Sequence, residues 1–433
     1  MVVDKMIIRE KNIFVHKYVH MCAFICGFMC ILVFMLQYNV NNIYGMDSEG
    51  NIVVVLDPGH GGMGGGSDDG ASYNGATERF INLTVANAAK QELEKYDKVK
   101  VYLTRNSVDE SVTLKNRAKF AESVNADFVF SMHFNASEGH QKYGAEVWIP
   151  SIGRYYSEGY KFAEISTDEL NKMGLFIRGI KTRVGDGEDE YYGIIRECEH
   201  RDIPAVIIEH CYIDNMYNYR YYNNEEALRE FGRADATAIA KYFRLKSSEN
   251  DYSEYSLAEV AQPAGRVYQD TSEPDVCEIW LNNYDAESGS LSFDISGRDK
   301  DSNIIYYSYS LDGGISFSDL FEWRDVDNDD RITVFVSNLG TDGEKLVVRV
   351  YNAYDLSSES NVIELNNTQE NGNKESGFEG DNGEINDAEN GNKKENMNDK
   401  GKSGRGKIKV FIGIFLVIGG IMVSVIMINK KRR

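Results

Sequence analysis

Two histidines in this sequence each follow a run of apolar residues. His60 comes after such a run and an Asp-Pro-Gly turn, and His133 ends a second run. A third apolar run, residues 204–208, ends in Glu209. Burying a carboxylate without a partner costs several kcal/mol, so packing alone does not explain Glu209. Because ligands of open α/β sheets bind at the carboxyl ends of strands, we expect these three side chains to meet at one edge of a sheet.

A fourth polar residue, Glu78, begins the helix that we predict after a glycine-rich loop, close to the strand end that carries His60. Two histidines, a nearby carboxylate and a second carboxylate across a cleft are typical of a catalytic zinc site. Zinc enzymes use three protein ligands and leave the fourth position for water, and a Glu that does not bind the metal transfers the proton. The alternative interpretation is that both histidines are structural and that Glu209 is solvated.

The elements that must position these residues come from the hydrophobic pattern. Residues 50–245 alternate strand-like apolar runs with apolar residues at helical spacing, which predicts an α/β domain. Strands are expected at residues 52–56, 99–103, 127–132 and 205–208. Helices are expected around residues 83–93, 114–124 and 228–242. We take residues 47–248 as the catalytic domain.

The pattern changes after a linker at residues 249–269. Between residues 270 and 365, short β-branched and aromatic runs alternate with turns, and Asp312-Gly313-Gly314 is typical of a hairpin. This predicts a smaller all-β sandwich, and its tyrosine-rich run at residues 306–314 resembles bacterial Ig-like or fibronectin-like modules. A spacer and a module that binds the wall or a partner are both open roles for it.

Both ends of the chain carry membrane signals. Residues 1–46 contain an apolar segment at about 21–38 with basic residues before it, which predicts a cytoplasmic N-terminus followed by a signal peptide or an uncleaved signal anchor. Residues 408–433 contain 19 uncharged residues, 410–428, and then a basic tail, which predicts a transmembrane helix. The Asn-, Glu-, Gly- and Lys-rich residues 366–407 predict a disordered stalk. We therefore expect a protein of the cell membrane whose α/β domain is extracytoplasmic.

Charge and cysteine content exclude other classes. The 433 residues include 47 Lys and Arg against 68 Asp and Glu, a formal net charge of −21. Such an acidic chain lacks the basic surface that nucleic-acid binding needs, so no nucleic-acid partner is expected. Three of the six cysteines lie in the first apolar segment, and the other three have neither disulfide-framework nor metal-ligand spacing.

The motifs together resemble the zinc-dependent N-acetylmuramoyl-L-alanine amidases, the amidase_3 type of peptidoglycan hydrolase, over residues 52–243. The matching stretches are residues 55–62, Glu78 with Asn82-Leu83, residues 103–105, Arg117, and residues 125–127, 131–136 and 204–209. The resemblance implies a mixed, mostly parallel sheet flanked by helices. It also implies peptidoglycan as substrate and cleavage of the amide between the lactyl group of N-acetylmuramic acid and L-alanine of the stem peptide.

The resemblance assigns roles to individual residues. His60, Glu78 and His133 match the ligands of a Zn²⁺ ion, and Glu209 matches the catalytic carboxylate, which acts on a zinc-activated water. Asn135 is expected to bind substrate by helping to shape the cleft. No activator, and no division or sporulation partner, is identified by the sequence.

One departure from the family follows the catalytic carboxylate. The family has a small residue and then Phe there, whereas this chain has His210-Cys211. His210 could tune the pKa of Glu209 or simply cap the strand. This departure keeps open a non-catalytic wall-binding or scaffold protein on a degenerate amidase fold. A zinc peptidase that cuts within the stem peptide is a third function, although the His-Glu-x-x-His helix of such enzymes is absent.

Overall fold

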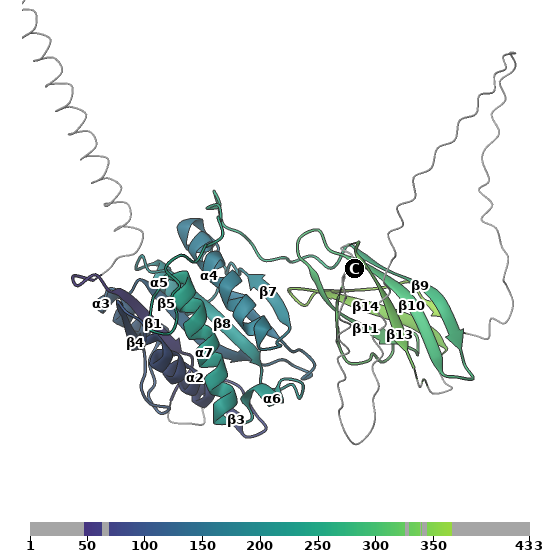
Figure 1. Ribbon diagram of the computed structural model, residues 1–433. Coiled ribbons are helices and arrows are strands. Elements are labelled where there is room, and N and C mark those ends of the chain that lie inside the picture. The colour runs from purple at the N-terminus through teal and green to yellow at the C-terminus, as the bar shows by residue number, and fades with distance from the viewer. Residues whose placement is uncertain (1–46, 63–68, 325–328, 338, 340–343, 366–433) are drawn as a thin grey trace, which may run out of the picture. The chain divides into compact units, whose positions relative to one another are not determined.

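The computed structural model describes residues 47–62, 69–324, 329–337, 339 and 344–365. A six-stranded sheet lies at the centre of the N-terminal domain, in the order β4-β1-β5-β8-β6-β7 (Figure 1). Its strands are β1 (Ile52–Pro58), β4 (Val99–Leu103), β5 (Phe128–Asn135), β6 (Ala145–Trp148), β7 (Ile177–Lys181) and β8 (Ala205–Tyr212). Strands β4, β1, β5 and β8 are parallel, and β6 runs antiparallel to β8. The predicted mixed, mostly parallel sheet is confirmed.

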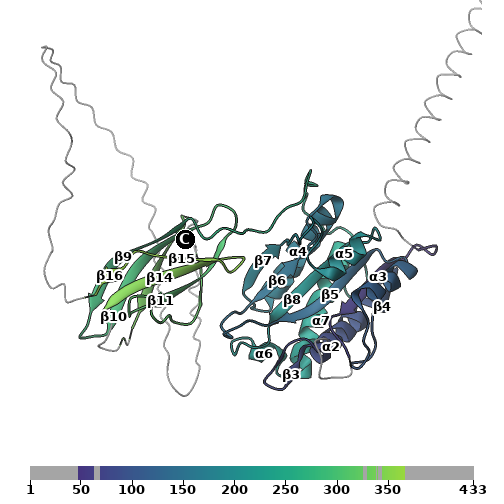
Figure 2. The ribbon, with the colours of Figure 1, turned by 180° about the vertical axis from the view of Figure 1, so that it is seen from behind.

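Helices cover both faces of this sheet. They are α2 (Glu78–Leu93), α3 (Leu114–Ser123), α4 (Gly153–Lys172), α5 (Gly193–Glu199), α6 (Tyr219–Tyr222) and α7 (Glu225–Tyr242). Successive strand residues point to opposite faces, so Leu56 joins the core under α2, α4 and α7, whereas Val55 joins a second core under α3 and α5. Figure 2 shows the sheet from the side opposite to that of Figure 1.

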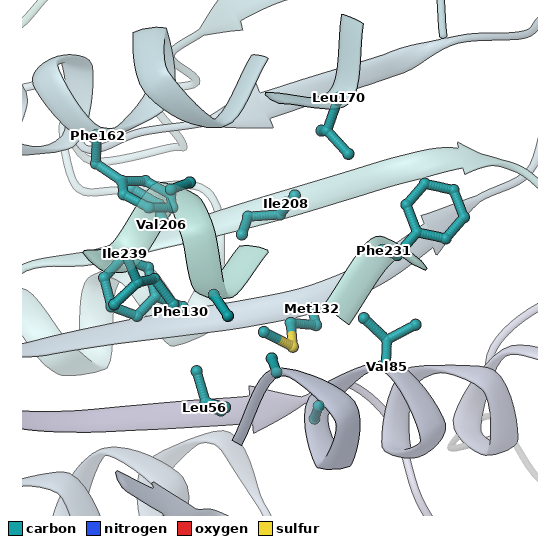
Figure 3. Close-up of a cluster of buried hydrophobic side chains, with 14 of the residues drawn as sticks. Leu56, Val85, Phe130, Met132, Phe162, Leu170, Val206, Ile208, Phe231 and Ile239 are labelled. Carbon is teal, nitrogen blue, oxygen red and sulfur yellow. The ribbon is translucent and has the colours of Figure 1, made fainter. Parts of the chain in front are cut away.

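The larger core explains why four strands were visible in the sequence. Leu56, Phe130, Met132, Val206 and Ile208 alternate along the parallel strands and point into this core (Figure 3). A strand buried on both faces reads as a continuous apolar run. Strands β6 and β7 were not predicted, because they have only four and five residues and include Glu146, Arg178 and Lys181. A two-stranded hairpin, β2 (Ser72–Tyr73) and β3 (Ala76–Thr77), precedes α2.

The β-rich region expected after residue 270 is present. One sheet contains β9 (Val276–Asp285), β10 (Ser290–Arg298) and β13 (Arg331–Val336). The other contains β11 (Ile304–Ser310), β12 (Phe321–Glu322), β14 (Lys345–Asn352), β15 (Ser357–Glu359) and β16 (Ile363–Glu364). Phe293 and Ile295 of the first sheet share one apolar core with Val348 and Val350 of the second, as in a β-sandwich.

The predicted membrane segments, at about residues 21–38 and 410–428, lie outside the described residues, as does the stalk at 366–407. Within the part of the chain that the structure describes, no helix combines the length and the apolar character that a membrane span needs.

A buried ion pair fixes the turn that carries His60. Asp57 of β1 is 1% exposed and accepts hydrogen bonds from Arg117 (2.6 Å), Thr104 (2.5 Å) and Ser131 (2.7 Å). Burial alone would raise the pKa of Asp57, but the charge of Arg117 and these hydrogen bonds hold it below its usual value. Arg117 also donates to the carbonyls of Pro58 (2.8 Å) and His60 (2.5 Å), and these hydrogen bonds fix the backbone of the turn.

We predict that Arg117→Met lowers the free energy of unfolding by about 3–5 kcal/mol, because it leaves the carboxylate of Asp57 buried without its counter-charge. Urea denaturation of the purified chain measures this change. Lys119→Met on the exposed side of the same helix is the matched control, with an expected change within about 0.5 kcal/mol. Equal losses in the two variants would contradict the assignment.

Candidate active site

Three of the predicted residues converge at the carboxyl ends of β1 and β5. Nε2 of His60 lies 3.1 Å from Oε1 of Glu78, and Nδ1 of His133 lies 2.9 Å from the same oxygen. Their candidate ligand atoms all lie within 4.8 Å of one another. Strands β1 and β5 are parallel neighbours, so both end at the same edge of the sheet, and α2 begins beside them with Glu78.

The carboxylate of Glu78 is held in place by backbone and side-chain donors. Its Oε2 accepts from the N–H of Ala71 (3.0 Å), and its Oε1 accepts from the N–H of Phe134 (3.2 Å) and from Asn82 (3.4 Å). Burial opposes ionisation of this side chain, but the hydrogen bonds with His133 and His60 hold the pKa of Glu78 well below its usual range. Glu78 is therefore an ionised carboxylate in a fixed orientation.

Two glycines make room for this cluster. A Cβ at Gly59 would lie 2.2 Å from Cε1 of His133, so only glycine lets the turn pass beside the imidazole. Gly70 has a φ of +70°, and a Cβ there would lie 2.5 Å from Oε2 of Glu78. Glycine at these two positions therefore lets the backbone pass close to the cluster.

Glu209 of β8 lies beside the cluster. It pairs with His133 in the parallel β5–β8 ladder, so the two side chains point to the same face of the sheet. Its Oε2 is buried and has no hydrogen-bond partner among the described residues. Burial, and then the negative charges of Glu78 and Glu146, hold the pKa of Glu209 well above its usual range. A carboxyl group of this kind is suited to proton transfer.

Glu146 of β6 is a residue that the sequence analysis missed. It is 2% exposed and lies opposite Glu209 in the antiparallel β6–β8 ladder. Its Oε2 accepts from Arg178 (2.7 Å) and Lys181 (2.6 Å). Burial opposes ionisation, but the charges of Lys181 and Arg178 lower the pKa of Glu146 to about 2. The argument used for Glu209, a carboxylate within an apolar run, applied equally to Glu146 and could have found it.

Asn135 lies at the end of β5, and its side chain is oriented by the protein. Its Nδ2 donates to Oε1 of Glu146 (3.0 Å), and its Oδ1 accepts from the N–H of Ala136 (2.9 Å). The structure therefore places Asn135 beside the carboxylates, and its expected contact with substrate stays a prediction.

His210 points away from Glu209, to the opposite face of β8. It is fully buried, with Nδ1 2.9 Å from the carbonyl oxygen of His133 and Nε2 2.8 Å from Oδ2 of Asp235 on α7. These contacts favour a structural role for His210 over tuning of the pKa of Glu209. Cys211 is a buried free thiol whose pKa is held well above its usual value by burial, and among the described residues it is not part of the candidate metal group.

The fold and the site together define an α/β domain with a candidate metal centre at one edge of its sheet. Residues 54–241 match the Amidase_3 family model, described as N-acetylmuramoyl-L-alanine amidase. The chain is 31% identical over 200 residues to the N-acetylmuramoyl-L-alanine amidase CwlM of Bacillus licheniformis. The aligned region covers 46% of this chain and 71% of that protein. The chain belongs to this family and is a peptidoglycan amidase.

Two further similarities are of the same kind. The sporulation-specific N-acetylmuramoyl-L-alanine amidase of Bacillus subtilis (strain 168) is 28% identical over 201 residues, which are 46% of this chain and 71% of that protein. The solved catalytic domain of CwlV, an N-acetylmuramoyl-L-alanine amidase from Bacillus (Paenibacillus) polymyxa var. colistinus, is 28% identical. The match covers 45% of this chain and 99% of that domain, with a TM-score of 0.38.

We predict that His210→Phe lowers the free energy of unfolding by about 3–5 kcal/mol, because the carboxylate of Asp235 loses its buried partner. The double variant His210→Phe/Asp235→Leu should recover most of this loss, since it removes both polar partners together. Thermal and urea denaturation measure both changes, with the exposed His200→Phe as control. A double variant as unstable as the single one would show that His210 acts through something other than this pair.

Proposed function

We propose that the amidase reaction uses a zinc ion bound by His60, Glu78 and His133, with Glu209 as the proton-transferring group. The observation that carries this proposal is the convergence of two imidazoles and an ionised carboxylate beside a carboxyl oxygen that has no partner among the described residues. The bond cleaved is the amide between the lactyl group of N-acetylmuramic acid and L-alanine of the stem peptide.

The three side chains fit such an ion. Two imidazole nitrogens and one carboxylate oxygen are a donor set that zinc takes in catalytic sites, where a fourth position stays open. The donors of Ala71 and Phe134 hold Glu78 in the way that second-shell hydrogen bonds orient metal ligands. When bound, zinc polarises the substrate carbonyl and lowers the pKa of a water molecule toward about 7.

Glu209 supplies the proton transfers. As a carboxylate it accepts a proton from the attacking water, and as a carboxylic acid it returns that proton to the amide nitrogen that leaves with L-alanine. Its repulsion from Glu78 is one reason why its pKa is raised. The ionised form of Glu209, which accepts the proton, would be favoured if the charge of Glu78 were neutralised in a metal complex of the three ligands.

Asn135 completes the proposed site. It lies two residues after His133 at the end of β5, and Glu146 fixes its amide group. We propose that it helps to shape the cleft for the muramyl peptide.

We predict that Glu209→Gln slows release of stem peptides by about 10²–10⁴-fold while the chain still binds one zinc ion. Mass spectrometry of digested peptidoglycan detects stem peptides with a free L-alanine amino group, and elemental analysis gives the metal content. His133→Ala should lose both zinc and activity, whereas the exposed Glu138→Gln should retain both.

Other outcomes would favour the rival functions. Products cleaved within the stem peptide would indicate a zinc peptidase. Bound zinc without any product from several types of peptidoglycan would indicate a non-catalytic wall-binding protein. Full activity of Glu209→Gln would remove Glu209 from the mechanism.

We also propose that the chain is attached to the cell membrane with residues 47–365 on the side of the cell wall. Support comes from the apolar segments at about 21–38 and 410–428, from the basic residues beside them and from a substrate that lies outside the cytoplasm.

We expect the full chain in the membrane fraction after alkaline extraction, with its folded part digested when protease is added to intact protoplasts. A chain without residues 408–433 should stay in the membrane if the first segment is an uncleaved anchor, and should be released if that segment is a cleaved signal. Recovery of the full chain from the cytosol would contradict the proposed location.

A further inference from the structure

One buried arginine joins the active-site domain to the β-sandwich. Arg178 of β7 is 1% exposed, and its Nε donates to Oε2 of Glu146 (2.7 Å). Its Nη2 donates to both carboxylate oxygens of Asp355 in the sandwich, at 2.7 and 2.8 Å, and its Nη1 donates to the hydroxyl of Tyr306 on β11, at 3.0 Å. The described residues of the two domains belong to one compact unit.

Further contacts join the two domains near this arginine. The hydroxyl of Tyr306 donates to the carbonyl of Tyr143, and the hydroxyl of Tyr354 lies 3.2 Å from both the N–H and the carbonyl oxygen of Thr182. Tyr143 and Phe176 pack against a small apolar cluster that the sandwich supplies. The buried members of that cluster are Ile305, Tyr306, Leu320 and Ala353. The arginine is therefore fixed by both domains.

The sandwich supplies the second carboxylate of this ion-pair network. On the side of the α/β domain, the carboxylate of Glu146 faces two buried cations, Arg178 and Lys181. Asp355 supplies the second negative charge, and Lys142 pairs with it at 2.9 Å from the outer side. Without Asp355, the guanidinium would keep one carboxylate partner instead of two and would gain freedom to turn away from Glu146.

Glu146 connects this ion-pair network to Asn135 and Glu209 in the proposed active site. It accepts the hydrogen bond that orients Asn135, and it lies opposite Glu209 in the β6–β8 ladder. The position of its charge relative to Glu209 therefore depends on how Arg178 is held.

We propose that the β-sandwich contributes to catalysis by the amidase domain. Asp355 and Tyr306 are positioning residues that hold Arg178. Through Arg178 they fix Glu146 and Asn135 beside Glu209. The proposal rests on the role proposed for Glu209. It gives the sandwich a function that neither a spacer nor a separate binding module has.

The test uses full-length chains, purified in detergent, acting on solubilised peptidoglycan strands. Asp355→Asn should lower kcat by roughly threefold to thirtyfold, with KM changed less than about twofold and zinc content unchanged. Asp294→Asn is the matched control, because Asp294 accepts hydrogen bonds from Asn282 and Thr333, both within the sandwich. Tyr306→Phe should lower kcat more than Tyr309→Phe, which alters a neighbouring tyrosine of the same strand.

A double-variant experiment shows whether Asp355 acts through Arg178. In chains that carry Arg178→Met, Asp355→Asn should cause no further loss of kcat, because the group that it positions is already absent. The proposal is overturned if Asp355→Asn matches Asp294→Asn in an active wild-type background. It is also overturned if the two losses multiply in the double variant, or if KM rises while kcat stays constant. A wild-type chain that releases no stem peptide would instead overturn the proposed function.

Discussion

Four carboxylates near one edge of a single sheet, three of them buried and the fourth, Glu209, half-buried, are the constraint on which this structure depends. Each would be costly to bury alone, and three have a compensating partner. Arg117 pairs with Asp57, Arg178 and Lys181 pair with Glu146, and His60 and His133 contact Glu78. The fourth, Glu209, has a buried oxygen without a hydrogen-bond partner among the described residues. Two of the compensated carboxylates, Asp57 and Glu146, are held by cations of the protein, and Glu78 belongs to the candidate metal centre. The uncompensated carboxyl of Glu209 is the group to which we assign the proton transfer in the proposed reaction.

The proposed reacting residues and the residues that pack against α7 lie on opposite faces of the sheet. His133 and Glu209 point to one face, whereas their neighbours Phe134 and His210 point to the other and contact α7. A residue next to the reactive carboxyl in sequence is therefore on the far side of the sheet in space. The unusual His210 consequently supports the backbone of His133 and leaves the environment of Glu209 to Glu78 and Glu146.

The sequence was informative where a strand has a simple pattern and a polar end. The parallel strands and the positions of His60, His133 and Glu209 could be predicted because a buried strand is an apolar run and the polar residues near its carboxyl end lie at the edge of the sheet where ligands bind. The partners of Glu146 could not be predicted, since Arg178 is 32 residues away on a strand of five residues, and Asp355 is 177 residues beyond Arg178. Ion pairs between distant segments leave no periodic signal in a single sequence.

The turn at Gly59 has a consequence for the evolution of this chain. The imidazole of His133 occupies the space in which any β-carbon at that position would lie. Every amino acid that a single-nucleotide change can put in place of glycine adds at least that carbon. Any substitution at residue 59 therefore requires that the imidazole of His133 first be replaced or displaced, so we expect these two positions to change together when they change at all.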